Sequence, residues 1–310
     1  MSIKLFDDTS IAMSRKLALN YSTSFSLGIR LLSKDNRWAV FSIYGLVRVA
    51  DEIVDTFHGF NKERLLSDFK AQTYQAIEEG ISTNPVLHAF QLAANQFGIG
   101  KDLIEPFFNS MEEDLDTSSH NAVSYSEYIY GSAEVVGLMC LKVFCNGDEA
   151  QYNHLVPFAR SLGAAFQKVN FLRDIRSDVD ERGRVYFPGV DFNHFTDADK
   201  YDIIQDVKQD FAHAYQGIVQ LPVACRLGVY TAYIYYLKLL EKIERTTAVD
   251  IFRKSRAYPQ FSKNRPAGEE FRSRKVDERL TKQPTENFVD PTKAMHLDLA
   301  GVFLVEFVVF

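Results

Sequence analysis

The chain has 310 residues, of which 46% are hydrophobic, and its formal net charge is −6 at pH 7. This length and composition allow one large packed core, and the negative charge gives no general basis for binding nucleic acid. The three cysteines show no CxxC spacing, which argues against a disulfide framework or a zinc site and fits a reducing cytoplasm. The sequence also lacks a signal-peptide pattern and any run of about 18 apolar residues, so we expect a cytoplasmic protein without a membrane-spanning helix.

Helical patterns follow one another along the chain up to about residue 250. Asn61 is placed to cap one helix, and Pro222 suits the first turn of another. Ser124 and Glu127 form a capping-box pattern in front of a helix that begins at Tyr128. No alternation of strands with helices and no repeat of fixed period is visible. The sequence therefore predicts an all-α single domain, a helical bundle with its functional site inside.

The last part of the chain has a different composition. Residues 253–296 contain eleven Lys or Arg and six Asp or Glu, a local charge of +5, together with four of the nine prolines. Such a composition is typical of a solvated or disordered segment rather than of a packed helix. We therefore expect a helical domain over residues 1–252 and an irregular tail over residues 253–310.

An apolar helix is predicted over residues 38–56, a segment with no proline and one glycine. Asp51 and Asp55 lie four residues apart, so their carboxylates share one face of this helix. Tyr44 and Arg48 extend the same face toward the N-terminus. Hard oxygen ligands on such a face suit Mg²⁺, which keeps several waters and takes other ligands from a substrate phosphate. The alternative is an exposed acidic face with an ion pair between Arg48 and Asp51.

A second polar stripe is predicted on a helix over residues 161–178. Four oxygen-bearing side chains recur there at spacings of i, i+3, i+7 and i+11, within a stripe about 80° wide. They are Gln167, Asn170, Asp174 and Asp178. The alternative is an ordinary amphipathic helix whose polar stripe faces water. Two helices with matching carboxylate stripes favour a common role in binding metal over coincidence.

Five sequence blocks stand in a characteristic order between about residues 15 and 250. They are YSTSF at 21–25, YGLVRVADEIVD at 44–55, YIYGSAEVVGLM at 128–139, QKVNFLRDIRSD at 167–178 and RGRVYFP at 182–188. In this order and spacing the chain resembles the squalene/phytoene synthases, which join two prenyl diphosphates head to head. The third and last blocks are most similar to their forms in the phytoene synthase branch. After about Arg256 the sequence departs from the family pattern.

The resemblance implies an isoprenoid synthase fold, a helical bundle around a deep apolar cavity. It implies the Mg²⁺-dependent condensation of two geranylgeranyl diphosphates, through the cyclopropyl intermediate prephytoene diphosphate, to phytoene. Mn²⁺ is an alternative metal, and no NADPH is expected because the Gly98-Ile-Gly100 pattern lacks the third glycine of a nicotinamide fingerprint. We also expect a monomer that contacts the inner face of a membrane peripherally, since its substrate and product are lipids.

The resemblance also assigns roles to individual residues. An allylic C–O bond breaks readily when the leaving diphosphate is neutralised, and aromatic rings stabilise the resulting carbocation. The implied metal ligands are Asp51, Asp55, Asp174 and Asp178. The implied catalytic residues, near the reacting carbons or the departing diphosphate, are Tyr44, Arg48, Tyr128, Arg173 and Tyr186. The implied substrate-binding residues are Tyr21, Ser22, Ser24, Gln167, Asn170 and Arg184.

Other interpretations stay open on the sequence alone. A relative that uses farnesyl diphosphate would make squalene, dehydrosqualene or a hopanoid precursor, and no motif reports the cavity depth that sets chain length. A non-catalytic relative would tend to lose the aspartates, and a terpene cyclase would carry a different second metal motif. Gly131 and Gly137, on a helix with other small residues, either leave room for a prenyl chain or allow close helix packing. The acidic run over residues 112–116 is interpreted as a solvated face.

Overall fold

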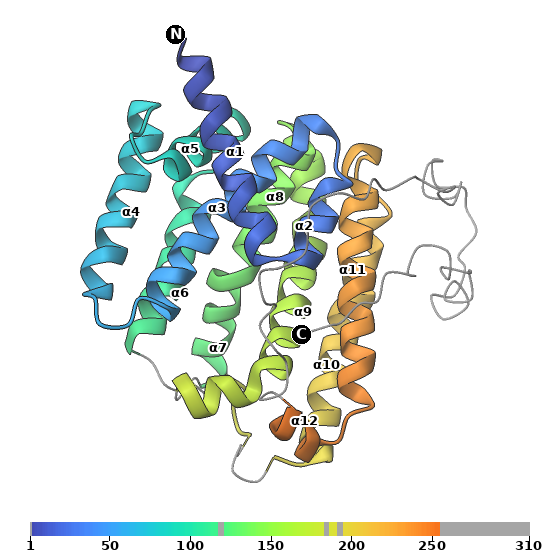
Figure 1. Ribbon diagram of the computed structural model, residues 1–310. Coiled ribbons are helices and arrows are strands. Elements are labelled where there is room, and N and C mark those ends of the chain that lie inside the picture. Colours follow the sequence, from blue (N-terminus) through green and yellow to red (C-terminus); the bar gives the residue numbers. More distant parts are fainter. Residues whose placement is uncertain (1, 117–120, 183–185, 191–194, 255–310) are drawn as a thin grey trace, which may run out of the picture.

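The computed structural model of the protein describes residues 2–116, 121–182, 186–190 and 195–254. Within these ranges the chain forms helices and no β-strand, which confirms the predicted all-α class (Figure 1). Helical structure extends to residue 254, two residues past the boundary expected at 252. The rest of the predicted tail, residues 255–310, lies outside the described residues.

The first half of the bundle contains six helices within the described residues. They are α1 (Ile3–Tyr21), α2 (Thr23–Arg30), α3 (Lys34–Asp55), α4 (Lys62–Glu79), α5 (Pro85–Phe97) and α6 (Lys101–Asp116). Helix α3 occupies the middle of this half and packs against α1, α4, α5 and α6. Asn61 caps α4 as predicted, because its side chain accepts a hydrogen bond from the Arg64 N–H at 2.9 Å. Gly80 ends the same helix in a left-handed conformation.

The second half is built around one long helix. In chain order it contains α7 (Ala122–Ile129), the π-helix η1 (Tyr130–Glu134), α8 (Val135–Cys145), α9 (Glu149–Arg182), α10 (Asp197–Ile218), α11 (Val223–Glu244) and α12 (Ala248–Lys254). Helix α9 packs against α8 and η1 on one side and against α10, α11 and α12 on the other. The two halves meet where α8 and η1 pack against α6 and where α11 packs against α2, and their outer helices α4 and α11 lie at opposite sides of the bundle (Figure 1).

The start of α7 differs from the prediction. The N-cap is Asn121, whose side chain accepts from the N–H groups of Val123 and Ser124. Ser124 completes the capping box from the third helical position and so does not begin a helix at Tyr128. Asparagine is at least as good an N-cap as serine, so the helix begins at Ala122 and not at Tyr128. The sequence pattern correctly predicted a capping box, but it assigned the N-cap to Ser124 and not to Asn121.

Two apolar clusters make up the core. The first fills the space between α3, α5, α6 and α8, and the second lies between α9, α10 and α11. The largest fully buried side chains of the first are Phe41, Phe90, Phe107 and Phe108, and Phe211 holds the same place in the second. Burying an aromatic side chain of this size contributes about 2–3 kcal/mol relative to leaving it exposed. The core therefore fixes the helix positions independently of the polar residues between them.

Backbone-to-backbone contact joins helices at two crossings. A Cβ on Gly228 of α11 would lie 2.6 Å from the carbonyl oxygen of Gly28 in α2, which holds α2 directly on α11. A Cβ on Gly131 of η1 would lie 2.4 Å from the carbonyl oxygen of Pro106 in α6. No side chain fits at either distance. For Gly131 the structure thus favours close helix packing over room for a prenyl chain.

The continuous helical run Val123–Cys145 has the length and mean hydropathy of a membrane-crossing helix. This run did not stand out as a candidate span from the sequence. Of its most apolar stretch, 56% is buried inside the bundle. A core helix satisfies the same criteria, and the Gly131 contact with α6 shows this run in that role.

Candidate active site

Helix α3 carries four predicted site residues on one face, namely Tyr44, Arg48, Asp51 and Asp55. The block YSTSF at 21–25 packs against this face. The ring of Tyr44 stacks on Phe25 of α2, with ring centroids 5.6 Å apart. Its hydroxyl is hydrogen-bonded to Ser22, and the Ser22 side chain in turn caps α2 by accepting from the Phe25 N–H at 3.1 Å. Burial raises the pKa of Tyr44 to about 12. Tyr44 is therefore a neutral, fixed phenol at neutral pH.

Arg48 lies one turn beyond Tyr44 and has two defined partners. Its guanidinium sits 4.4 Å from the centroid of the Tyr21 ring, within the range of a cation–π contact. It forms an ion pair with Glu52, one turn further along α3. The Arg48 Nε atom is buried and has no hydrogen-bond partner within the described residues. A buried donor without a partner is costly, so this nitrogen is available to an anionic ligand.

The metal-binding role proposed for α3 falls on Asp51 and Asp55, both of which are partly buried. Asp51 lies close enough to Tyr44 to raise the pKa of that phenol, so it belongs to the same face. The alternative interpretation of an exposed acidic face is thereby disfavoured. The predicted substrate-binding residue Ser24 lies on α2, and its side chain is outside the described part of the structure.

The polar stripe of α9 has the predicted order. Gln167, Asn170 and Asp174 are partly buried, and Asp178 is 4% exposed. Arg173 donates from Nε to Oδ1 of Asp174 at 2.8 Å. Burial lowers the pKa of Arg173, but the hydrogen bond and charge of Asp174 outweigh it and leave the pKa raised. The arginine is therefore permanently charged and held beside the stripe.

Tyr236 of α11 joins this stripe, although nothing in the sequence singled it out. Its hydroxyl donates to Oδ1 of Asn170 at 3.3 Å, and its ring stacks on Phe166 with centroids 4.0 Å apart. Burial raises its pKa, while nearby Arg173 opposes that rise. The sequence signal that could have identified Tyr236 is the pair Tyr235-Tyr236 within an apolar helix. A buried tyrosine hydroxyl needs a polar partner, so such a pair indicates a polar group nearby.

Tyr44 and Tyr236 bring the α3 and α9 stripes into one region. The pKa of Tyr44 responds to the charge of Asp51 and to Tyr236, and that of Tyr236 responds to Asp174. Tyr44 is thus near Asp51 and Tyr236, and Tyr236 is near Asp174. Helices α2 and α11, joined at Gly28 and Gly228, hold the aromatic residues that complete this region.

A second aromatic group contains the predicted residues Tyr128 and Tyr186. Their rings are 5.3 Å apart, and Tyr186 stacks on Phe171 of α9 with centroids 4.0 Å apart and an angle of 9°. The Tyr128 hydroxyl donates to the carboxylate of Asp114, at 3.0 Å to Oδ1 and 2.9 Å to Oδ2. The interpretation of the acidic run as a solvated face is therefore wrong for Asp114. Arg184, predicted to bind substrate, lies outside the described residues.

The carboxylates of the α3 and α9 stripes are the donors available to a magnesium ion in this region. Among the residues that the structure describes, no three His, Cys, Asp or Glu side chains converge to hold an ion. The two stripes supply only oxygen donors, as two carboxylates on each helix. Mg²⁺ is commonly bound by one or two carboxylates, with water and substrate phosphate completing an octahedron. The residues fit an ion of that kind and do not form an all-protein cage.

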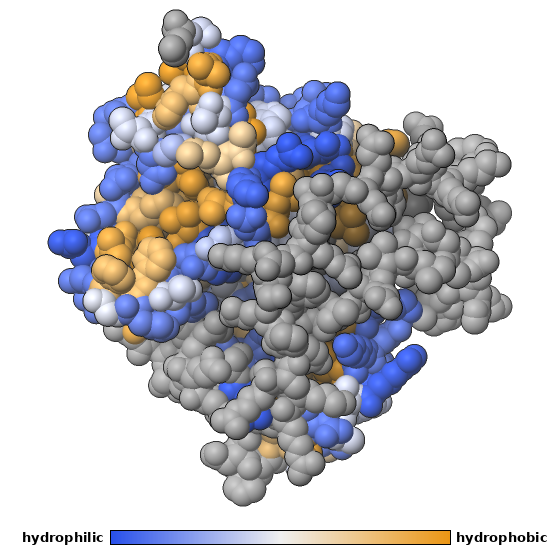
Figure 2. Space-filling model, viewed as in Figure 1, coloured by the Kyte–Doolittle hydropathy of each residue, from blue (hydrophilic) through white to orange (hydrophobic). Residues whose placement is uncertain are grey.

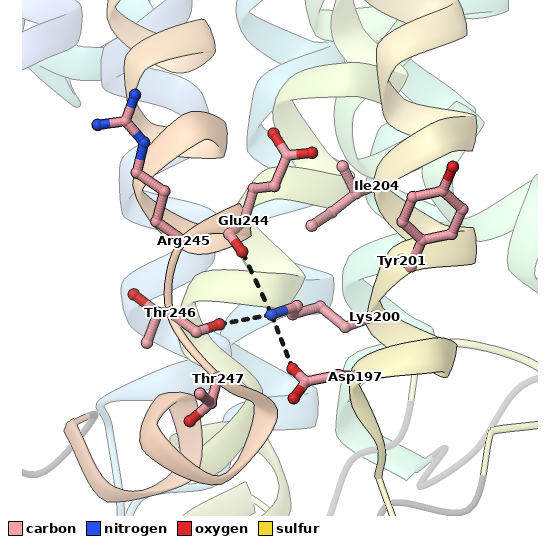
Figure 3. Close-up of a pocket in the computed structure, with 8 residues that line it drawn as sticks. All are labelled: Asp197, Lys200, Tyr201, Ile204, Glu244, Arg245, Thr246 and Thr247. Carbon is pink, nitrogen blue, oxygen red and sulfur yellow. Dashed lines mark hydrogen bonds and ion pairs between the residues drawn. The ribbon is translucent and has the colours of Figure 1, made fainter.

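A separate pocket of about 310 Å³ lies where α10, α11 and α12 meet (Figure 3). Lys200 is 6% exposed, and its ammonium group donates to Asp197 at 2.9 Å and to the carbonyl oxygens of Glu244 and Thr246 at 3.4 and 2.5 Å. The pocket contains none of the predicted site residues. Its lining consists of Asp197, Lys200, Tyr201, Ile204, Glu244, Arg245, Thr246 and Thr247.

Solved structures with the same helical arrangement define the class of fold. A dehydrosqualene synthase matches with a TM-score of 0.68 at 20% identity, over 81% of this chain and 97% of that chain. A squalene synthase from Alicyclobacillus acidocaldarius matches with a TM-score of 0.68 at 17% identity, over 79% of this chain and 96% of that chain. The protein therefore has the all-α isoprenoid synthase fold, as predicted.

The sequence comparison names the family. The squalene/phytoene synthase family matches residues 18–263, and the chain belongs to this family of prenyltransferase-type synthases. A phytoene synthase from Arthrospira platensis is 29% identical over an alignment of 284 residues that covers 82% of this chain and 90% of that protein. A 4,4'-diapophytoene synthase from Staphylococcus haemolyticus is 27% identical over 195 residues, 62% of this chain and 66% of that protein.

Proposed function

We propose that the protein condenses two molecules of geranylgeranyl diphosphate head to head to form phytoene, through prephytoene diphosphate. The observation that carries the proposal is the pair of carboxylate stripes on α3 and α9, linked by Tyr44 and Tyr236. The relatives named as phytoene synthases support the choice of product, among them the Arthrospira protein at 29% identity. A product made without reduction also agrees with the absence of a nicotinamide fingerprint in the sequence.

Each group of residues has a part in this reaction. Arg48 and Arg173 would hold and neutralise the diphosphates, and the buried Arg48 Nε offers a donor for that purpose. Asp51, Asp55, Asp174 and Asp178 would hold Mg²⁺ (or Mn²⁺), which would supply the Lewis acidity that weakens the allylic C–O bond. The rings of Tyr44, Phe25 and Tyr236 would shield the carbocation from water and face it with their negative surfaces.

A second candidate uses the fifteen-carbon farnesyl diphosphate and makes dehydrosqualene, squalene or a hopanoid precursor. The similarity to a 4,4'-diapophytoene synthase at 27% identity supports it. The chemistry at the diphosphate is the same in both cases. The difference lies in the length of prenyl chain that the site accepts.

The test is incubation of the purified chain with Mg²⁺ and labelled fifteen- or twenty-carbon diphosphate, with and without NADPH. Phytoene from the twenty-carbon substrate alone is the expected result. Preferential turnover of the fifteen-carbon substrate would replace the proposal with the second candidate, and dependence on NADPH would identify squalene as product. A folded protein that turns over neither substrate would be a non-catalytic relative.

We further propose that the protein works as a monomer and contacts a membrane surface peripherally. Exposed apolar side chains support that contact (Figure 2). They include Phe57 and Phe60, 37% and 72% exposed, which lie side by side in the connection between α3 and α4. Co-sedimentation with lipid vesicles tests the contact, and recovery of the protein only in the supernatant would contradict it.

A further inference from the structure

Glu52 of α3 holds Arg48 in place, although the sequence patterns did not single it out. The two residues lie one helical turn apart and form an ion pair. The side chains of Arg48 and Glu52 are 26% and 14% exposed, so the pair is largely shielded from water. Within the described part of the chain, Glu52 is the one ion-pair partner of Arg48.

The stability of α3 gives no reason for a carboxylate at position 52. The helix ends at Asp55, and its last turn contains no basic residue. The unpaired carbonyls give this end of a helix a partial negative charge, so a further negative charge there is unfavourable. An arginine followed by a glutamate four residues later is also the weaker order for such a pair. The contact with Arg48 is therefore the feature that accounts for Glu52.

Two contacts fix the plane of the Arg48 guanidinium. The ring of Tyr21, at the end of α1, covers one face, with the guanidinium carbon 4.4 Å from the ring centroid. Glu52 accepts a hydrogen bond from Nη2 at one edge. A guanidinium is planar, and its five N–H donors point in fixed directions. A contact at the face and a contact at an edge together determine where the Nε–H of Arg48 points.

The donor left over is the Arg48 Nε, which is buried and has no hydrogen-bond partner within the described residues. A buried N–H without an acceptor is costly, and an oxygen of an anionic ligand would satisfy it. Arg48 is near enough to Tyr44 to oppose the rise in its pKa, and Arg173 does the same for Tyr236. Two guanidinium groups therefore belong to this region, and together they favour an oxyanion such as a diphosphate.

We propose that Glu52 is a positioning residue that holds the Arg48 guanidinium in an orientation that leaves Nε available to an oxygen of the substrate diphosphate. The inference rests on the proposed function, which assigns the diphosphate to Arg48. Charge alone predicts the opposite effect, because a carboxylate beside an anion site repels the anion and its removal would strengthen binding. Positioning predicts weaker binding once the acceptor oxygen is lost, so the sign of the change distinguishes the two roles.

The experiment compares Glu52→Leu with Glu52→Gln, which both lack the charge, while only glutamine keeps an acceptor oxygen for Nη2. The probe is inorganic diphosphate with Mg²⁺, and its Kd is measured by isothermal titration calorimetry. We expect Glu52→Leu to raise Kd about tenfold and Glu52→Gln about threefold or less, the size of one charge-assisted hydrogen bond. In steady-state kinetics, KM for the prenyl diphosphate should rise by the same factors, with kcat nearly unchanged.

Three further variants serve as controls. In the Arg48→Gln background, Glu52→Leu should cause no further loss, because the group that it positions is gone. Glu241→Leu is the matched control, since Glu241 pairs with Lys238 at 2.9 Å on α11 and neither residue belongs to the candidate site. It should leave Kd unchanged. If Glu52→Leu does not fold, Glu52→Ala takes its place, because alanine is the residue most favourable to a helix.

The outcomes separate the inference from the function on which it rests. Equal losses from Glu52→Leu and Glu52→Gln, or tighter binding by both, would show that only the charge matters and overturn the inference. A loss that persists in the Arg48→Gln background would show a merely structural role and overturn it as well. A wild-type protein that binds no inorganic diphosphate would overturn the anion site. If the expected pattern of Kd values is found but no prenyl diphosphate is turned over, the proposed function fails and the role of Glu52 stands.

Discussion

Two polar regions of the molecule differ in how their charges are satisfied. At the corner formed by α10, α11 and α12, the three donors of Lys200 meet two backbone carbonyls and Asp197, and the set is closed (Figure 3). On α3 and α9, Arg48 pairs with Glu52 and Arg173 pairs with Asp174, while the buried Arg48 Nε has no hydrogen-bond partner in the part of the chain that the structure describes. A closed set serves the fold, whereas a set that retains a donor for an anion is organised for a ligand.

The largest expected effect is on the reaction rate, when an aspartate of the α3 or α9 stripe is replaced. Asp51→Asn and Asp174→Asn should each lower the rate of diphosphate release about 1000-fold, because each removes a charged oxygen proposed to bind metal. The melting temperature should change little. Asp8→Asn, in an exposed ion pair with Lys4, is the control and should keep full activity. An Asp51→Asn protein with near-wild-type turnover would remove that residue from the metal site.

At the closed corner the expected effect is on stability. Lys200→Met should lower the free energy of unfolding by about 2–3 kcal/mol, because it leaves two carbonyl acceptors and Asp197 without their buried donor. Chemical denaturation measures this loss, and kcat of the remaining folded protein should be unchanged. Lys208→Met breaks the more exposed pair with Glu244 and should cost less than about 1 kcal/mol. Comparable losses for the two variants would mean that Lys200 is not a buried anchor.

A smaller effect is expected where the tyrosines join the two stripes. Tyr236→Phe keeps the ring stacked on Phe166 but loses the hydrogen bond to Asn170, so KM for the diphosphate should rise about tenfold or less. Steady-state kinetics measure the change. Tyr201→Phe removes a hydroxyl from an exposed tyrosine at the closed corner and should change nothing. A Tyr236→Phe enzyme indistinguishable from wild type would exclude Tyr236 from the substrate site.

The smallest expected effect is a change in how stability depends on pH when Asp197 of the closed corner is replaced. Hydrogen bonds from Lys200 and from the Ala248 N–H lower the pKa of Asp197 below its ordinary value of 3.8. A carboxyl whose pKa is depressed in the folded state stabilises the fold above its unfolded pKa, and this contribution is lost as the pH falls through the folded pKa. Asp197→Asn should therefore unfold with a shallower dependence on pH below about 4. If the free energy of unfolding of Asp197→Asn depended on pH as steeply as that of the wild-type protein, the lowered pKa of Asp197 would be contradicted.

Helical periodicity was enough to predict much of the candidate site. The spacing of Asp51 and Asp55, and of the stripe ending at Asp178, depends only on which residues share a helix face, and those faces are present. The contact of Tyr21 and Ser22 with the α3 face needed the family blocks as well, because the two segments lie on different helices.

Asp114 and Tyr236 could not be found in the same way. Each reaches the site from a helix with no catalytic block, through a packing arrangement that local patterns do not encode. The cap of α7 shows the same limit at short range, since the pattern pointed to Ser124 whereas the N-cap in the structure is Asn121. Sequence patterns thus predict which residues share a helix face better than they predict which helix faces pack against each other.

The π-helix η1 has a consequence for the rotational phase of the helices on either side of it. A π-turn accommodates one residue more than an α-turn, and each residue advances an α-helix by about 100°. Deleting one residue within Tyr130–Glu134 would therefore rotate α7 by roughly that angle relative to α8. The apolar face of α8 would stay in the core while Tyr128 turned away from Asp114. The extra residue in η1 therefore allows one continuous helical segment to direct the core-packing residues of α8 and the site residue Tyr128 of α7 to different sides.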